Sequence, residues 1–334
     1  ALRFPGVNTE VGEPLNTMRL KGDDSGRAAR RMESDDGPLD PGELQRLIGD
    51  LYRAYEQKSI THDRFATTLF HILTGRRPRQ SADLKCRDLQ DHTRYVCIPR
   101  AKQRGGTFRS TFRSIEFSAV HFAVFEHQRA LVRAHFELLL DGLAIELPSQ
   151  DVESLLLDLP LFPAWRRLMP SLQEASDLVK AGQLDKARLL LREHAFGPRW
   201  HRKSVSVLEE LQHAATASGA KARDGTPLQL DGRRLRHTKG TDLARAGLSP
   251  EIISWVMDHT LLSSTRIYID NLPEHAIPPN TAMSNSVVMQ NVVFNHGGVG
   301  LRSTGSGAVT ANTSYSNAVG LLVEGFSGAI ANNL

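Results

Sequence analysis

The sequence predicts a mainly α-helical fold with a small antiparallel β-sheet, followed by a short β-solenoid-like tail. Three observations lead to this prediction. Apolar residues recur at helical spacing over most of residues 40–260, and two short alternating runs flank a Gly-Gly turn. Residues 276–334 are instead rich in Gly, Asn, Ser and Val, with only a few charged side chains. The length of 334 residues allows one large domain or two ordinary ones.

The first two helices have recognisable ends. Asp40 is a good N-cap, Pro41 suits the first helical position, and Glu43 completes a capping box. The apolar period that follows predicts an amphipathic helix to about residue 55. A second helix is predicted over residues 61–74, and Gly75 is placed to end it.

A change of period after residue 89 predicts a β-hairpin. The runs 95–98 and 114–117 resemble strands, and Gly105 and Gly106 lie at a turn between them, so that Lys102 falls on the hairpin. Helical signals return over residues 119–217.

Three further helical segments are predicted within and after residues 119–217. Residues 178–194 are expected to form part of a helical hairpin that serves packing alone. Residues 235–246 form another predicted helix, closed by Gly247, and Ser249 with Pro250 begins a further one that runs to about Asp258.

The two ends of the chain differ from this central part. Residues 1–38 are polar without a sustained apolar period, which predicts a disordered or truncated segment before a domain at 39–275. In the tail, Val299-Gly300-Leu301 returns as Val319-Gly320-Leu321, a period typical of parallel β-helix rungs. Two rungs are fewer than a solenoid needs to bury its faces, so the tail is expected to be incomplete or marginally ordered.

Charge and cysteine content narrow the class of protein. Between Arg76 and Arg113 there are eleven Lys and Arg against three Asp, and between Lys221 and Arg245 seven against three. Such concentration of basic charge is expected of a phosphate-binding surface. Two cysteines are too few for a disulfide framework, and no signal peptide or apolar span is evident. We therefore expect a cytoplasmic, nucleoid-associated protein.

Four short motifs follow one another along the chain. Thr74-Gly75-Arg76-Arg77 ends a helix, and Ile98-Pro99-Arg100-Ala101-Lys102 lies on the hairpin. Arg233-Arg234-Leu235-Arg236-His237 begins a helix, and His259 precedes Tyr268 by nine positions. Each motif alone is weak, because an isolated Arg, Lys or Tyr is usually a surface or packing residue.

Together, in this order and spacing, the motifs resemble the catalytic domain of the tyrosine site-specific recombinases, the phage-integrase family. The resemblance covers about residues 40–272 and implies double-stranded DNA as partner, a homotetramer on DNA and accessory DNA-bending proteins. It implies no metal and no other cofactor. The implied catalytic residues are Arg77, Lys102, Arg233, Arg236, His259 and Tyr268. The expected DNA-binding residues are Arg76, Arg79, Arg100, Arg104, Arg109, Arg113, His237 and Lys239.

The resemblance implies cleavage and rejoining of DNA through a 3′-phosphotyrosine. Arg77 and Arg236 would stabilise the pentavalent phosphorus, because fixed guanidinium groups match its developing charge. Tyr268 would attack, and Lys102 would protonate the leaving 5′-oxygen. His259 would bind the phosphate or position the tyrosine.

Two positions depart from the family pattern. Arg233 stands where the family has a histidine, and Gln80 stands where it has an acidic residue. Arginine stays protonated at neutral pH and cannot act as an ordinary general base, although it can bind phosphate.

Three other functions stay open from the sequence. The chain could be a catalytically impaired DNA-binding relative or a type IB topoisomerase-like enzyme that relaxes DNA. If the tail dominates, it could be a surface or carbohydrate-binding β-solenoid protein.

Overall fold

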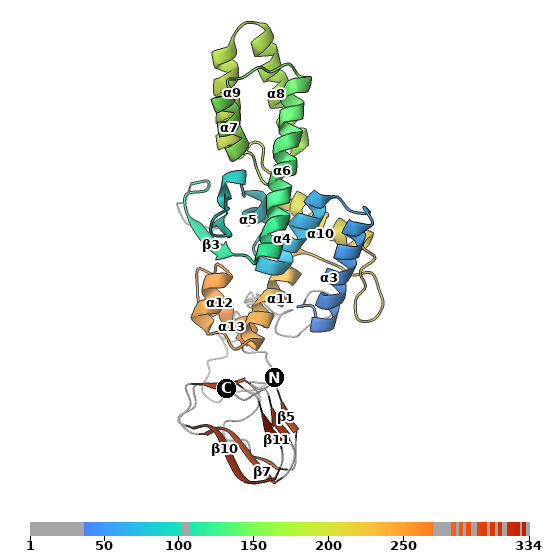
Figure 1. Ribbon diagram of the computed structural model, residues 1–334, viewed down its shortest axis with the longest axis vertical. Helices are drawn as coiled ribbons and strands as arrows, with labels where there is room; N and C mark the ends of the chain where they lie inside the picture. Colours follow the sequence, from blue (N-terminus) through green and yellow to red (C-terminus); the bar gives the residue numbers. More distant parts are fainter. Residues whose placement is uncertain are drawn as a thin grey trace, which may run out of the picture.

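The computed structural model describes residues 37–101 and 107–269, together with the strands of the tail given below. The helical expectation is confirmed over this part of the chain (Figure 1). Its helices are α3 (Pro41–Glu56), α4 (His62–Thr74), α5 (Pro78–Ala82), η1 (Cys86–Asp88), α6 (Ala119–Gly142), α7 (Ser149–Asp158), α8 (Trp165–Lys180), α9 (Leu184–Phe196), α10 (Ser204–Ala217), α11 (Gly232–Arg245), α12 (Pro250–Val256) and α13 (Ser263–Ile269). Of the segment 1–38 that was predicted to be disordered or truncated, residues 1–36 lie outside the described residues.

The predicted caps are present. The Asp40 carboxylate accepts a hydrogen bond from the Glu43 amide, and the Glu43 side chain accepts one from the Asp40 amide, which completes the capping box of α3. Thr61 caps α4, and Gly75 ends it in the left-handed conformation with φ of 58°. The turn after Gly75 therefore leaves the helix at a defined position.

The small sheet has three strands, β1 (Leu89–Gln90), β2 (Tyr95–Pro99) and β3 (Phe112–Glu116), in that order. The β2–β3 pair is antiparallel, with Val96 opposite Ile115 and Pro99 opposite Phe112, as the alternating pattern predicts. Strand β1 was not predicted, because two residues carry no readable period. The predicted Gly105-Gly106 turn lies outside the described residues.

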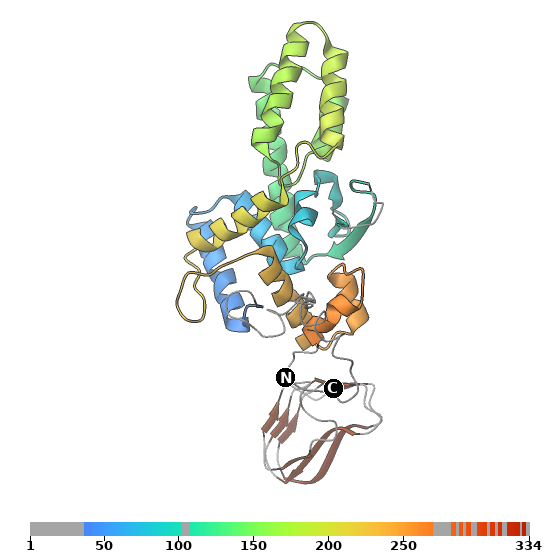
Figure 2. The ribbon, with the colours of Figure 1, turned by 180° about the vertical axis from the view of Figure 1, so that it is seen from behind.

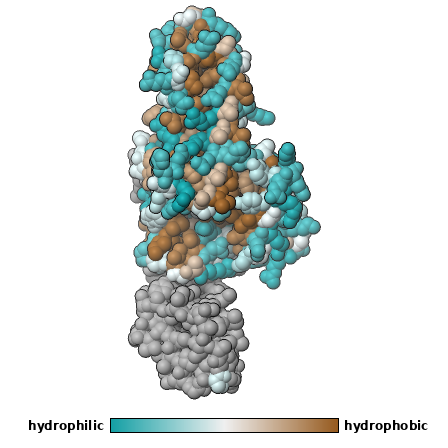
Figure 3. All heavy atoms as spheres, in the orientation of Figure 1, coloured by the Kyte–Doolittle hydropathy of each residue, from teal (hydrophilic) through white to brown (hydrophobic). Residues whose placement is uncertain are grey.

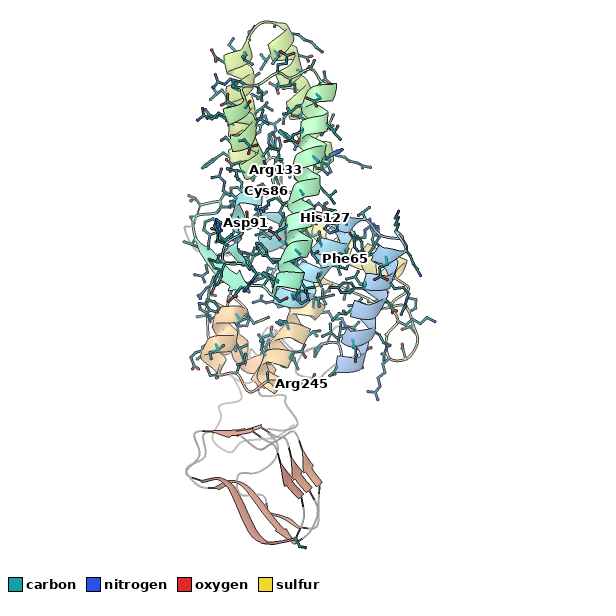
Figure 4. The ribbon with its side chains drawn as sticks, in the orientation of Figure 1. Phe65, Cys86, Asp91, His127, Arg133 and Arg245 are labelled. Atoms are coloured by element: carbon teal, nitrogen blue, oxygen red, sulfur yellow. The ribbon has the colours of Figure 1, made fainter. Side chains whose placement is uncertain are left out.

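A helical protrusion, defined as the outer part of α6 with α7, α8 and α9, stands away from the rest of the helical body (Figure 1, and Figure 2 from behind). It has its own apolar core, which includes Phe136, Leu172, Leu191 and Trp200. The helical hairpin predicted around residues 178–194 is the α8–α9 pair, which turns at Gly182 with φ of 71°. Cys86 lies at the base of this core, as Figure 4 shows, and burial raises the pKa of its thiol to about 12.

The body of the helical part has two larger apolar cores and a small one among α11, α12 and α13 that contains Ile253, Met257 and Tyr268. One of the larger cores lies among α3, α4 and α10 and contains Leu51, Phe65 (labelled in Figure 4) and Leu211. The other larger core joins the sheet to α4 and α6 through Phe70, Ile98 and Phe125. Since α11 packs on α4, the motif at Arg233–His237 and the motif at Thr74–Arg77 are held on neighbouring helices.

The segment before α3 also contacts α11. Leu39 is buried, and its amide donates to the Thr238 hydroxyl at 2.9 Å. Arg234 donates from Nε to the Gly37 carbonyl at 3.2 Å and lies 3.6 Å from Glu43. These contacts fix the start of the folded domain against the helix that carries Arg236.

The described strands of the tail are short: β4 (Ala282–Ser284), β5 (Val287–Met289), β6 (Val292–Phe294), β7 (Val299–Gly305), β8 (Ala308–Thr310), β9 (Thr313–Tyr315), β10 (Val319–Phe326) and β11 (Ala329–Ala331). They pair in parallel, in the orders β10-β7-β4, β11-β8-β5 and β6-β9. Val319 pairs with Val299, and Ala329 with Ala308. The parallel β-helix itself stays a prediction.

The surface of the helical part mixes apolar and polar side chains (Figure 3). Exposed apolar residues include Leu138, Leu189 and Phe196 on the protrusion, and Trp255 and Leu261 in and after α12. No described helix combines the length and apolar character needed to cross a membrane.

Candidate active site

The motif at Thr74–Arg77 forms a tight turn between α4 and α5. The buried His71 ring bonds the carbonyl of Arg76 through Nδ1 at 3.1 Å and the hydroxyl of Ser81 through Nε2 at 2.8 Å. A carbonyl only accepts, so Nδ1 carries the proton. Because the ring is neutral, Nε2 accepts from the Ser81 hydroxyl, which also lies 3.0 Å from the Pro78 carbonyl and has one proton for the two acceptors. This neutral imidazole holds both sides of the turn and thereby fixes the position of Arg77.

We expect the stability of the fold to depend on this histidine in mild acid. Burial lowers the pKa of His71 to about 4. The unfolded chain takes up the proton near pH 6.5, whereas the folded chain does not until about pH 4. Protonation therefore favours the unfolded chain as the pH falls. Between pH 6.5 and about pH 4, His71 should lower the free energy of unfolding by about 3 kcal/mol.

Urea unfolding at a series of pH values between about 7 and about 4 measures this effect. His71→Gln, which cannot titrate, should be less stable at neutral pH and should show a flatter dependence over the window. An equal slope in both proteins would contradict the assignment, because the other buried histidines titrate alike in both.

The motif at Arg233–His237 places a buried arginine between two backbone turns. Arg236 lies on α11, which Asp231 caps, and its side chain is about nine-tenths enclosed. Nη1 donates to the Gly75 carbonyl at 2.9 Å, and Nη2 donates to the Met257 carbonyl. Arg236 thus joins the turn at Gly75 to the turn that precedes His259.

Tyr268 lies on the short helix α13, with its side chain 2% exposed. Its ring packs directly on α11, because a Cβ at Gly240 would lie 2.7 Å from three of its ring carbons. The His259 ring stacks on it at a centroid distance of 5.9 Å, and the His237 ring lies 5.8 Å away. The Tyr268 hydroxyl lies beside the Arg236 guanidinium group, whose charge acts on it.

The segment from His259 to Tyr268 is held by a contact within itself. His259 Nδ1 lies 2.8 Å from the Thr265 hydroxyl, so the histidine before the helix and the threonine within it fix one another. Arg77 donates from Nη1 to the Asp258 carbonyl at 3.2 Å, beside this histidine. Arg77, Arg236, His259 and Tyr268 therefore meet at one place.

The electrostatics of this place are strongly cationic. Burial lowers the pKa of Arg236 to about 10, which still leaves it protonated at neutral pH. Burial raises the pKa of the Tyr268 hydroxyl, while Arg236 and Arg77 oppose the rise. Burial, Arg236 and Arg77 lower the pKa of His259 to about 3, so its ring is neutral at neutral pH. The site can bind an anion and holds a neutral imidazole against the tyrosine ring.

The structure does not place the other two predicted catalytic residues, Arg233 and Lys102, at this site. Arg233 is exposed on α11, one residue after the start of that helix, and forms no ion pair within the described part of the chain. Lys102, like the predicted DNA contact Arg104, lies outside the described residues.

Two of the predicted DNA contacts are buried or nearly buried. Arg76 is completely buried, 4.0 Å from the carboxylate of Asp258. Arg109 is 9% exposed and makes a two-pronged contact with Asp88, at 2.8 and 2.7 Å. Both guanidinium groups are used inside the protein, which a count of basic residues cannot reveal.

The other predicted DNA contacts keep partial exposure or lie at the site. Arg79 is about half exposed and pairs with Asp83 at 2.7 Å. Arg100 and Arg113 pair with Asp258 and are each 23% exposed. Lys239 is partly buried, which lowers the pKa of its ammonium group, and His237 is buried beside Tyr268.

Sequence reasoning missed two residues of the site, Asp258 and Gly240. Asp258 contacts several arginines, and Gly240 provides the flat surface on which the tyrosine ring lies. The local signal for Asp258 was its adjacency to His259, which does not reveal the distant arginines that it contacts. For Gly240, a glycine inside a predicted helix was the available signal, since such a glycine often has a packing reason.

The sequence matches no protein-family model and no curated protein. Among solved structures, XerA recombinase is 14% identical with a TM-score of 0.41, over 70% of this chain and 59% of that one. XerH site-specific recombinase bound to difH substrate, in a pre-cleavage complex, is 13% identical with a TM-score of 0.39, over 69% and 49%. The Tn1549 transposon integrase in complex with transposon right end DNA is 14% identical with a TM-score of 0.40, over 73% and 65%. The chain thus spans about half to two thirds of the length of these structures.

Proposed function

We propose that this chain is a tyrosine site-specific recombinase whose catalytic domain comprises residues 39–275. The observation that carries the proposal is the contact between the Tyr268 side chain and Arg236, with Arg77 donating to the same turn. A hydroxyl in contact with one buried guanidinium group and near a second is placed to attack a phosphate that both would bind.

The proposed reaction transfers a phosphodiester to the protein and back. The Tyr268 oxygen bonds to phosphorus, the bond to the 5′-oxygen breaks, and a 3′-phosphotyrosine forms. Arg77 and Arg236 stabilise the charge that builds on the non-bridging oxygens. The free 5′-hydroxyl of another strand reverses the step, so the bond energy is conserved and no nucleotide is consumed.

The leaving 5′-oxygen needs a proton, which we assign to Lys102. This residue follows Arg100 by two positions, and the Arg100 guanidinium pairs with Asp258 at the site. The Gln80 amide also donates to the Pro99 carbonyl at 3.0 Å, so the base of the hairpin is fixed beside the Arg77 turn. A lysine ammonium group can supply such a proton as a general acid.

The proton of Tyr268 requires an acceptor, and Arg233 cannot serve as one. We assign this role to His259, which stacks on the tyrosine ring and is neutral at neutral pH. Its pKa is lowered partly by Arg236 and Arg77. A bound phosphate would offset their charge and raise the pKa of His259, which makes the imidazole a better acceptor when substrate is present.

The partners of this chemistry are double-stranded DNA, three further copies of the chain and accessory DNA-bending proteins. The test does not need a known target. The protein is incubated with a random-sequence duplex library that carries nicks, so that cleaved strands cannot be religated. The proposal expects DNA that stays attached to the protein in denaturant and yields a recurrent sequence. If no DNA becomes attached under any condition, the chain is instead a catalytically impaired DNA-binding relative. The exposed position of Arg233, where the family has a catalytic histidine, supports this alternative.

A topoisomerase-like activity has a separate signature. An enzyme of that kind would relax a supercoiled plasmid of arbitrary sequence without joining two recovered sites. Joining between two plasmids that carry the recovered sequence supports recombination, and relaxation alone contradicts it.

We expect Gly240→Ala to displace the Tyr268 ring without disrupting the fold. The added Cβ would lie 2.7 Å from ring carbons of Tyr268 and must displace the ring from α11. Alanine favours helix by about 1 kcal/mol over glycine, so propensity alone predicts no loss of the helix. Adduct formation should fall at least about tenfold, the effect expected when a reacting group is misplaced by an ångström or less. DNA affinity by fluorescence anisotropy should stay within a factor of two to three of the wild-type value.

The matched control is Gly49→Ala, since a Cβ at this position of α3 meets no atom within 4 Å. It should leave adduct formation unchanged. An equal rate in Gly240→Ala and wild-type protein would show that the packed position of Tyr268 is not the reactive one.

A further inference from the structure

Asp258 lies in the turn after α12, where its backbone has φ of 53° and its side chain is 1% exposed. One carboxylate oxygen accepts from Arg100 Nε at 2.6 Å and lies 3.5 Å from Arg113 Nε. The other accepts from the Gln80 amide at 3.1 Å and lies 4.0 Å from Arg76. A single buried carboxylate thus contacts three arginines and one amide.

These contacts come from distant parts of the chain. Arg100 and Arg113 lie at the base of the hairpin, on the residue after β2 and within β3. Gln80 lies on α5, directly after the Arg77 turn. The carboxylate therefore joins the hairpin to the Arg77 turn, in the segment that also precedes His259.

Several buried or half-buried arginines lie close together at this site, so a negatively charged group is needed beside them. Arg76, Arg77 and Arg236 act on one another through space, and Arg113 acts on Arg76 as well. Arg76 is fully enclosed, and its guanidinium nitrogens have no hydrogen-bond partner within the described part of the chain. Buried charge without a counter-ion is strongly unfavourable. Within that part, Asp258 is the carboxylate that ion-pairs with this cluster.

The contact with Gln80 connects this carboxylate to a departure from the family pattern. Position 80 is expected to be acidic by resemblance, but a neutral glutamine stands there. Its amide oxygen accepts from the Arg77 amide at 3.1 Å, while its amide nitrogen donates to Asp258. The negative charge expected at position 80 is therefore carried by Asp258, which accepts a hydrogen bond from Gln80 but lies on another segment of the chain.

We infer that Asp258 is a positioning residue of this site, which fastens the base of the hairpin to the Arg77 turn and supplies the negative charge that Gln80 lacks. Its left-handed backbone contributes to the same function. The carbonyls of Met257 and Asp258 accept from Arg236 and Arg77, so the turn orients both arginines while its carboxylate holds the hairpin. The link to catalysis rests on the proposed function, but the anchoring of the hairpin does not.

The first experiment measures anchoring in the full chain without DNA. Asp258→Asn keeps the size of the side chain and a residue type that tolerates positive φ, and it removes the charge. Amide hydrogen exchange over residues 95–99 and 112–116 should become about tenfold faster, because a buried ion pair that limits local opening is lost. Asp151→Asn is the matched control, since this buried carboxylate forms its ion pairs with Arg188 and Arg192 within the protrusion. It should leave exchange in the hairpin unchanged.

A second substitution tests whether the charge can return from the neighbouring position. In the double variant that combines Asp258→Asn with Gln80→Glu, the carboxylate introduced at position 80 lies across the same hydrogen bond. It can accept from the side-chain amide introduced at position 258. Gln80→Glu also loses the donor to the Pro99 carbonyl, so this single variant is measured as well. Hairpin exchange in the double variant should be slower than the two single changes together predict. Exchange in Asp258→Asn equal to wild type, or single changes that simply add in the double variant, would overturn the inference.

The third measurement separates positioning from simple stability. With DNA recovered as a covalent adduct, Asp258→Asn should form adduct roughly ten- to a hundredfold more slowly, the range seen when a residue that orients a reactive group is removed. Affinity for the same DNA should not fall, because the variant is more positive than wild type. The Gln80→Glu substitution should restore part of the rate. An undiminished rate of adduct formation in Asp258→Asn would overturn its role in catalysis. If no variant and no wild-type protein forms adduct, the proposed function is refuted, and the hydrogen-exchange result alone decides whether Asp258 anchors the hairpin.

Discussion

Replacing Tyr268 by phenylalanine should abolish covalent attachment to DNA and leave the fold and DNA affinity almost unchanged. The substitution removes one oxygen and keeps the ring on Gly240 and against the ring of His259. The hydroxyl is the proposed nucleophile, so no other atom can form the phosphotyrosine bond. Adducts formed on the recovered DNA, resolved on a denaturing gel, measure the loss, and fluorescence anisotropy measures the retained affinity.

The matched control is Tyr52→Phe, on α3, where the ring contacts Phe65 at a centroid distance of 5.0 Å outside the candidate site. It should form adducts at the wild-type rate. Residual adduct in Tyr268→Phe protein that is free of wild-type enzyme would reject Tyr268 as the nucleophile, and with it most of the proposed mechanism.

The helices of the fold were predictable where their ends carry local signals. Asp40 and Ser249 cap helices at the expected positions, because a side-chain oxygen next to free backbone amides needs no distant partner. Helix α13 was not predicted. It has seven residues, too few to be stable alone, and it is held by the packing of Tyr268 on α11.

Four of the six predicted catalytic residues meet at the candidate site, whereas the residues that surround them were not predictable. Motif order and spacing indicated that Arg77, Arg236, His259 and Tyr268 would meet, and the structure places them together. The burial of Arg76 and Arg109 was not readable, because each guanidinium group depends on a carboxylate that only the folded chain brings near. Asp258 was missed for the same reason, since its partners are distant in the sequence, on the hairpin and beside the Arg77 turn.

Replacing Arg236 by alanine should reduce adduct formation far more than it reduces DNA affinity. The guanidinium group contacts the tyrosine hydroxyl and would face the phosphate, so its charge is used most where the transition state develops. The loss should be about 3 kcal/mol in the cleavage step, by analogy with the removal of one oxyanion-stabilising donor. That corresponds to a rate lower by roughly a hundredfold.

Alanine also leaves the carbonyls of Gly75 and Met257 without their donor, so stability must be measured beside activity. Arg236→Lys resolves this ambiguity, because it keeps the charge and loses the planar fork that donates in two directions. We expect near wild-type DNA affinity with a cleavage rate still at least about tenfold lower. Arg192→Ala, on α9 of the protrusion, is the control for the loss of an arginine and should leave cleavage unchanged. A lysine variant with the wild-type rate would show that charge alone is required at this position and would remove the geometric role of Arg236 from the mechanism.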